Sequence, residues 1–135
     1  MTEHELVALA LNIRERAYAP YSGFRVGAAL LCGDGSVYTG CNLENASYPC
    51  GLCAERVAAA KALSEGRRDF RLLAVAVSSK ELCTPCGLCR QFLFEFAPQM
   101  RILCANDAGA WQAYGLHALL AEGFGGASLP GGTKD

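Results

Sequence analysis

The chain has 135 residues, of which 52% are hydrophobic and 19% are charged, and its twelve Lys and Arg nearly balance thirteen Asp and Glu to a net charge of −1. This length and composition predict a single globular domain over residues 1–135 and argue against a disordered chain. The near-neutral charge lacks the basic character of a nucleic-acid binder, so the expected ligand is a free small molecule and not a nucleic acid.

The N-terminal apolar run is too short for a secretory signal or a membrane span. It reaches only from Leu6 to Leu11 before Asn12 and Arg14 interrupt it. Without a secretory signal, the eight cysteines are expected to be thiols or metal ligands in a reducing compartment. We therefore expect a cytoplasmic protein that does not contact a membrane.

Hydrophobic periodicity and turn residues predict alternating helices and strands along the chain. In chain order the expected elements are a helix over 3–17, strands over 25–32 and 37–42, a helix over 53–64, a strand over 72–78, a helix over 86–96, strands over 100–105 and 110–114, and a short helix over 116–121. The continuous apolar run of the strand over 72–78 is typical of a strand covered on both faces. Helices are therefore expected on both sides of the sheet.

Single residues mark where some of these elements begin and end. Thr2 and Glu5 have the spacing of a capping box at the start of the first helix. Pro85 is expected to open the helix over 86–96, because the first helical position needs no amide hydrogen. The Gly-rich, polar residues after Phe124 predict a flexible tail over about 125–135.

Cysteines occur in two similar CGLC segments, from Cys50 to Cys53 and from Cys86 to Cys89. One interpretation is a closed, four-cysteine structural zinc site. However, the interval between the segments is longer than the roughly fifteen to twenty residues of a zinc ribbon, and a closed site gives no reason for Glu55 to lie two residues after Cys53. A redox dithiol at Cys86 and Cys89 is another interpretation, although its thioredoxin-like context is missing.

The alternative metal site uses only Cys53, Cys86 and Cys89 and leaves the fourth tetrahedral position open for water, as catalytic zinc requires. Cys86 and Cys89, three residues apart at the start of one helix, lie on one face, and a helix N-terminus stabilises thiolates. Glu55 would then lie near the metal without binding it. This pattern predicts a metal centre with a base beside it.

Four short motifs, taken together, resemble one enzyme family. They are Asn42-x-Glu44-Asn45, Tyr48-Pro49, Cys53-Ala54-Glu55-Arg56 and Pro85-Cys86-Gly87-x-Cys89-Arg90-Gln91. With these motifs, the chain from about Tyr21 to Phe124 resembles the short, zinc-dependent, homotetrameric cytidine deaminases. The resemblance implies an α/β fold, a three-layer α-β-α sandwich with a mixed sheet of about five strands. It also implies hydrolytic deamination of cytidine and deoxycytidine to uridine and deoxyuridine, with release of ammonia, in pyrimidine salvage.

The resemblance also implies a role for each matching residue. Cys53, Cys86 and Cys89 match the ligands of one Zn²⁺ per subunit, Glu55 matches the proton shuttle, and Arg56 matches a cation that hydrogen-bonds the ligand sulfurs. The positions that match substrate contacts are Phe24 at the pyrimidine ring, Asn42 and Glu44 at the ribose hydroxyls, and Ala54 at the base. Tyr48 and Phe124 also match substrate-binding positions, aromatic ones through which neighbouring subunits of a homotetramer close one another's sites.

Other motif residues have structural interpretations. Arg90 and Gln91 are expected to brace their helix rather than to touch substrate, and Cys50 departs from the family, whose members commonly carry an aliphatic residue there. The cysteines interpreted simply as small apolar residues are Cys32, Cys41, Cys83 and Cys104. Two alternative functions stay open: deamination of another aminopyrimidine or aminopurine compound or of a cytosine in nucleic acid, and a non-catalytic zinc or redox module.

Overall fold

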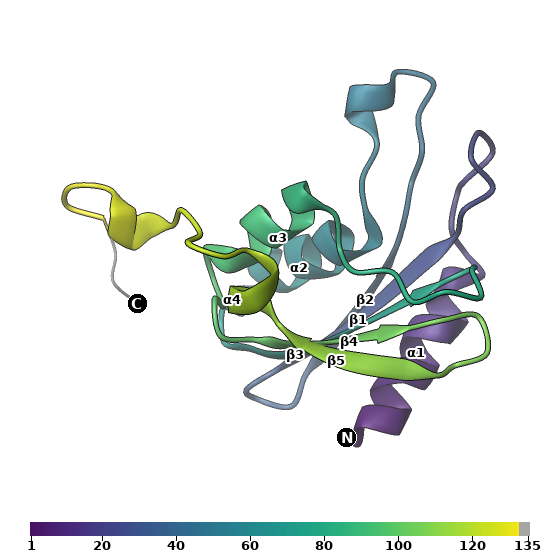
Figure 1. Ribbon diagram of the computed structural model, residues 1–135, viewed down its shortest axis with the longest axis horizontal. Helices are drawn as coiled ribbons and strands as arrows, with labels where there is room; N and C mark the ends of the chain where they lie inside the picture. The colour runs from purple at the N-terminus through teal and green to yellow at the C-terminus, as the bar shows by residue number, and fades with distance from the viewer. Residues whose placement is uncertain (133–135) are drawn as a thin grey trace.

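A computed structural model describes residues 1–132 and shows a central sheet with helices packed against it (Figure 1). The elements are α1 (Glu3–Arg14), β1 (Val26–Cys32), β2 (Val37–Cys41), α2 (Ala54–Ser64), β3 (Phe70–Val77), α3 (Gly87–Phe94), β4 (Arg101–Ala105), β5 (Trp111–Gly115) and α4 (Leu116–Leu119), with 3₁₀ turns at Tyr48–Cys50 and Gly126–Ser128. The end of the expected flexible tail, residues 133–135, lies outside the described residues. Among the described helices, none has both the length and the apolarity needed to cross a membrane.

The five strands form one mixed sheet in the order β2-β1-β3-β4-β5. β3 and β4 run parallel, and every other neighbouring pair is antiparallel. Parallel neighbours need a crossover connection, which here contains α3. The expected α/β fold with a mixed, five-stranded sheet is confirmed.

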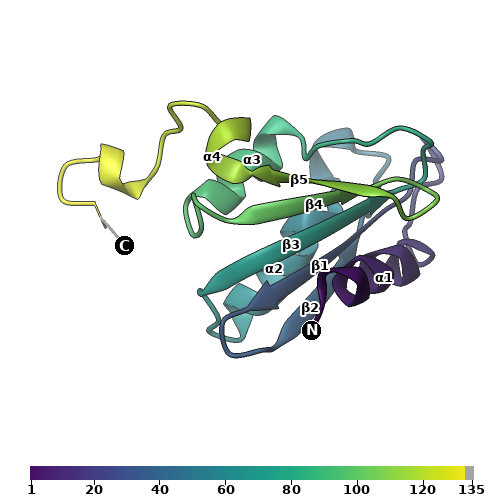
Figure 2. The same ribbon diagram turned by 60° about the horizontal axis from the view of Figure 1, so that its bottom comes forward.

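Helices cover both faces of the sheet, α1 on one side and α2 and α3 on the other (Figure 2). Successive side chains of a strand point to opposite faces. In β1, Ala29 packs with the buried residues of α1, whereas Ala28 and Leu30 pack with those of α2 and α3. This double burial explains why the sequence of β3 is apolar throughout and confirms the three layers.

α2 lies unusually close to the edge strand β2. A Cβ atom added at Gly40 would lie 2.6 Å from the amide nitrogen of Ala58 and 2.7 Å from the carbonyl oxygen of Ala54. The face that α2 turns inward consists of alanines, among them Ala54, Ala58 and Ala62, all fully buried. Small side chains on both elements thus fix where α2 begins, directly after Cys53.

The helix ends differ from expectation at two places that matter for the site. Thr2 and Glu5 form the predicted capping box, but α1 ends at Arg14. The next amides bond carbonyls three residues back, and the amide of Tyr18 then bonds the carbonyl of Asn42. The prediction that Pro85 opens the third helix is wrong. Cys86 is the N-cap residue of α3 and has an extended backbone, which places Pro85 before the cap.

Candidate active site

Three thiols meet where the N-termini of α2 and α3 converge. Cys53 is the N-cap residue of α2, Cys86 is that of α3, and Cys89 lies in the first turn of α3. Their sulfur atoms are 3.8 Å apart between Cys53 and Cys86 and 3.6 Å apart between Cys86 and Cys89. A tetrahedral zinc ion with bonds of about 2.3 Å needs sulfurs about 3.8 Å apart. The three residues therefore fit one tetrahedral metal ion and provide three of its four ligands.

The surroundings of Cys53 favour its thiolate form. Neither Cys53 nor Cys86 makes a side-chain hydrogen bond to its helix, so the positive ends of both helices face the sulfurs without a capping side chain. Hydrogen bonds from the Cys89 thiol and from Arg56, whose Nη2 lies 3.9 Å from Cys53 Sγ, lower the pKa of Cys53 to about 5 despite its partial burial. The same donation to Cys53 raises the pKa of Cys89.

Glu55 lies in the first turn of α2 and is the buried charged residue of the described chain, with 4% of its surface exposed. Burial raises the pKa of Glu55 to about 7, and the negative charge of Cys53 acts in the same direction. A carboxyl group with a pKa near neutrality can both accept and donate a proton under physiological conditions. Glu55 can therefore act as both a general base and a general acid beside the thiols.

An open cleft of about 770 Å³ lies above the thiols. Its lining includes Phe24, Asn42, Glu44, Tyr48, Cys53, Ala54, Glu55, Arg56 and Cys86. Of the residues predicted for the site, Cys89 and Phe124 do not line it: Cys89 is fully buried, and Phe124 is 55% exposed on the segment after α4. The fold thus gathers residues from four separate stretches of sequence around one cleft.

Asn42 and Glu44 hold the loop that carries Phe24. Asn42 Nδ2 donates to the carbonyl oxygen of Phe24 at 2.8 Å, and Asn42 Oδ1 accepts from the amide of Val26 at 2.9 Å. Glu44 accepts from the amide of Ser22 at 3.1 Å and from the Ser22 hydroxyl, and this hydroxyl lowers the pKa of Glu44. The part that Ser22 plays was missed from the sequence, although its place in the loop before Phe24 could have suggested it.

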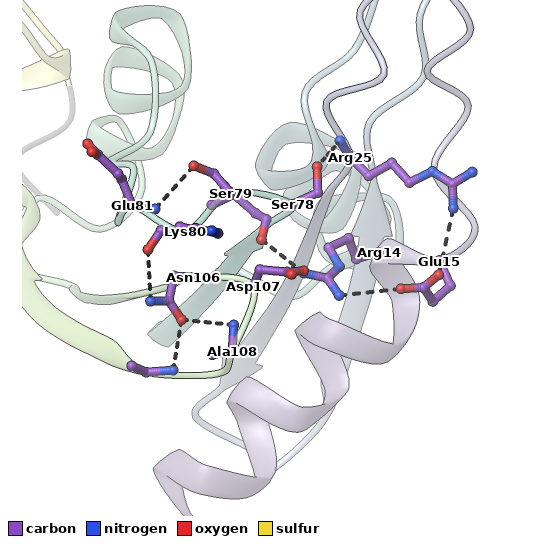
Figure 3. A network of polar contacts seen from close by, with 12 residues as sticks. Arg14, Glu15, Arg25, Ser78, Ser79, Lys80, Glu81, Asn106, Asp107 and Ala108 are labelled. Carbon is purple, nitrogen blue, oxygen red and sulfur yellow. Dashed lines mark hydrogen bonds and ion pairs between the residues drawn. The ribbon is translucent and has the colours of Figure 1, made fainter.

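A polar network supports the loop that leads from β3 to Cys86 (Figure 3). The amide of Asp107 donates to the carbonyl of Ser79 at 2.8 Å, and Asn106 Nδ2 donates to the carbonyl of Lys80 at 3.1 Å. Arg14 joins α1 to this network through Asp107, at 2.9 Å. From the sequence, residues 106–109 were recognised only as a turn, and their role in anchoring this loop was missed.

The other cysteines divide into buried and accessible ones. Cys32 and Cys104 lie in the core, and burial raises the pKa of Cys104 to about 12. Cys41, the last residue of β2, and Cys83, in the loop between β3 and α3, are only half-buried. Cys50 is exposed and lies outside the group of three thiols.

The known proteins that this chain resembles in sequence and in structure are cytidine deaminases. Residues 1–105 match the sequence model of the family described as the cytidine and deoxycytidylate deaminase zinc-binding region. A cytidine deaminase from Halalkalibacterium halodurans is 46% identical over 125 residues, which are 92% of this chain and 95% of the relative. One from Sporosarcina psychrophila is 50% identical over 96 residues, 71% of either chain. The crystal structure of cytidine deaminase from Burkholderia pseudomallei has a TM-score of 0.89 at 43% identity, over 92% of this chain and 100% of that one.

Proposed function

The chain belongs to the cytidine and deoxycytidylate deaminase family, and from this membership we propose that it hydrolyses cytidine and deoxycytidine to uridine and deoxyuridine, releasing ammonia. The two curated cytidine deaminases, which are 46% identical over 125 residues and 50% identical over 96 residues, support this reaction. We further propose that the reaction depends on zinc and serves pyrimidine salvage in the cytoplasm. The thiols, the buried carboxyl of Glu55 and the side chains that line the cleft support the proposal.

Cys53, Cys86 and Cys89 would hold one zinc ion per subunit. The spacing of 3.6 and 3.8 Å between their sulfurs suits such an ion. When bound there, zinc supplies the Lewis acidity that makes water a nucleophile at neutral pH. Three thiolates carry more negative charge than zinc carries positive, and Arg56 together with the two helix N-termini would offset part of that excess.

The observation that carries the proposal is the buried carboxyl of Glu55, whose pKa lies near 7, beside the thiol cluster. A Glu carboxylate oxygen would accept a proton from the attacking water. It would deliver this proton to ring nitrogen 3, and it would then take the second proton, from the hydroxyl now on carbon 4, and deliver it to the amine that leaves as ammonia. General acid–base catalysis of this kind contributes about 10²- to 10⁴-fold.

The substrate would lie along the cleft between Phe24 and α2. Phe24 would pack against the pyrimidine ring, and the backbone at Ala54 would contact the base. Asn42 and Glu44 would bind the ribose hydroxyls. An ionised carboxylate has about four acceptor positions, so Glu44 can accept from a sugar hydroxyl while it holds Ser22. The bonds that Asn42 and Glu44 already make would keep both side chains in place before substrate arrives.

We propose a homotetramer in which subunits complete one another's sites. Tyr48 at the rim of the cleft is 78% exposed, and Phe124 is 55% exposed on a C-terminal segment that projects from the body of the subunit (Figure 1). Tyr48 lies beside the ring of Tyr21, which is also exposed, and exposed apolar patches are typical of surfaces that another protein covers. A neighbouring copy that covers them would also close the cleft.

Conversion of cytidine by the purified, zinc-loaded protein tests the proposal, followed by ultraviolet absorbance at neutral pH. We expect conversion of cytidine and deoxycytidine and none of free cytosine, because the sugar contacts would be lost. A folded, zinc-containing protein that converts neither nucleoside would contradict the proposal. It would favour another amine-bearing substrate or a purely structural metal site instead.

A further inference from the structure

The guanidinium of Arg90, which follows Cys89 in α3, is held by three acceptors from two separate segments. Nε donates to the carbonyl of Pro85 at 2.6 Å, and Nη2 donates to the hydroxyl of Thr84 at 2.7 Å. Nη1 donates to the carbonyl of Leu119, the last residue of α4, at 2.7 Å. All three acceptors are uncharged, and Arg90 forms no ion pair within the described chain. These hydrogen bonds therefore hold residues 84, 85 and 119 in place around Arg90, and they neutralise no charge.

The side chain of Arg90 acts on the chain directly before Cys86. Its Nε holds the carbonyl of Pro85, while the carbonyl of Cys86 accepts the main-chain helix bond from the amide of residue 90 at 3.0 Å, which any residue there would keep. Cys86 is the exposed member of the thiol cluster, whereas Cys53 is half-buried and Cys89 is buried. Because packing holds Cys86 less than the other two thiols, its position depends more on these hydrogen bonds.

The next residue of α3 holds the chain beyond α4. Gln91 Nε2 donates to the carbonyl of Phe124 at 2.7 Å. A Cβ atom added at Gly123 would lie 2.8 Å from the ring of Phe94, so this segment also packs closely on α3. Residues 119–124 are thus attached to the same helix turn that carries two of the thiols.

We propose that Arg90 is a positioning residue, which fixes the Cys86 thiol for the metal and ties it to the segment over residues 119–124. The inference rests on the zinc site of the proposed function and not on the identity of the substrate. Lysine cannot replace Arg90, because a single ammonium cannot match three acceptors arranged around a planar guanidinium. Loss of groups that hold a metal ligand in place typically weakens metal binding about 10- to 100-fold.

The test is the rate at which the zinc-loaded protein releases zinc to a chromophoric chelator, measured without substrate. We expect Arg90→Lys and Arg90→Gln to release zinc about 10- to 100-fold faster than the wild type. Arg101→Lys is the matched control, because Arg101 is exposed and bonds Glu3 at 2.6 Å, away from the cleft. A folded Arg90 variant that releases zinc at the wild-type rate would overturn the proposal.

Two milder variants keep the test decisive if the Arg90 variants do not fold. Thr84→Val removes one of the three acceptors, and we expect faster release together with altered thiolate-to-metal absorption of the cobalt-loaded protein. Unchanged release and absorption would overturn the positioning role. Gln91→Leu frees the carbonyl of Phe124, and we expect release faster than in the wild type but slower than in Arg90→Lys. Wild-type release in this variant would overturn the link to the C-terminal segment.

The outcome can be separated from that of the proposed function. A wild type that binds zinc but does not convert cytidine would contradict the deaminase proposal, and the zinc-release comparison would still decide the role of Arg90.

Discussion

Glu55 and Cys53 occupy one turn of α2, and the state of each affects the other. The cysteine loses its proton readily because Cys89 and Arg56 donate to it, and the resulting negative charge adds to burial in keeping Glu55 protonated up to about pH 7. A carboxyl group that was exposed at this position would be ionised throughout the physiological range. The burial of Glu55 therefore matters as much as its position two residues after a thiol.

Replacement of Glu55 by glutamine separates proton transfer from the rest of the site. The amide has nearly the same shape and cannot exchange a proton, so Glu55→Gln should keep its zinc and its assembly but lose about 10²- to 10⁴-fold in turnover. Zinc content and cytidine conversion measure the two effects. Glu65→Gln, at the other end of α2, is the control and should be fully active. Near-normal turnover of Glu55→Gln would remove Glu55 from the mechanism.

Cys50 tests which thiols hold the metal. Its side chain is exposed and lies outside the group formed by Cys53, Cys86 and Cys89. Cys50→Ser should therefore retain one zinc ion per subunit and full activity, whereas Cys53→Ser should lose zinc. Metal analysis after dialysis measures both. A Cys50→Ser protein without zinc would show that the repeated CGLC segments form a four-cysteine site after all.

At the scale of elements, the site depends on how closely α2 approaches β2. The N-terminus of α2 carries both Cys53 and Glu55, and its position is set by contact between the helix backbone and the glycine of an edge strand. Any side chain at Gly40 would push the helix outward and carry Cys53 and Glu55 with it. Packing far from the substrate thus controls geometry at the cleft.

The variant Gly40→Ala measures this dependence. The added Cβ would meet backbone atoms of Ala54 and Ala58 at 2.7 and 2.6 Å, which cannot move away independently of the helix. Overpacking of this kind costs about 1–3 kcal/mol, and we expect a lower melting temperature together with weaker zinc retention. Gly87→Ala is the control, since a Cβ at Gly87 meets no atom within 4 Å. Equal melting temperatures for Gly40→Ala and the wild type would show that α2 can shift at no cost.

The elements and the thiols could be predicted from the sequence because each has a local signal. Apolar periodicity marks the helices and strands, and the spacing of Cys86 and Cys89 places both at one helix terminus. The anchors of the loops have no such signal. Arg90 with Leu119, or Asn106 with Lys80, join residues that are more than twenty positions apart, and only the folded chain shows which carbonyl faces which donor. The chain after α1 likewise departs from the predicted helix, and the backbone partner of Tyr18 there, Asn42, lies in a distant loop.

At the scale of the whole molecule, the cleft of the described chain is open, and Tyr48 in its lining is 78% exposed. Phe124 does not line this cleft within its own chain, although its carbonyl accepts a hydrogen bond from Gln91 of α3. A segment that is fixed at its base and exposed at its side chain can contact a second copy without a large cost in ordering. The proposed sharing of sites between subunits would account for both features together.

Mixing two inactive variants tests whether subunits complete one another's sites. Glu55→Gln lacks the base, and Phe124→Ala lacks the aromatic side chain; each alone should have low activity. If Phe124 acts in the site of a neighbouring subunit, mixed oligomers contain sites that combine Glu55 from one chain with Phe124 from another. Co-refolding the two variants should then restore cytidine conversion well above the sum of the separate proteins, in a species whose mass by light scattering is that of four chains. If Phe124 acts only within its own chain, every mixed site lacks one group, and activity will not rise above that sum.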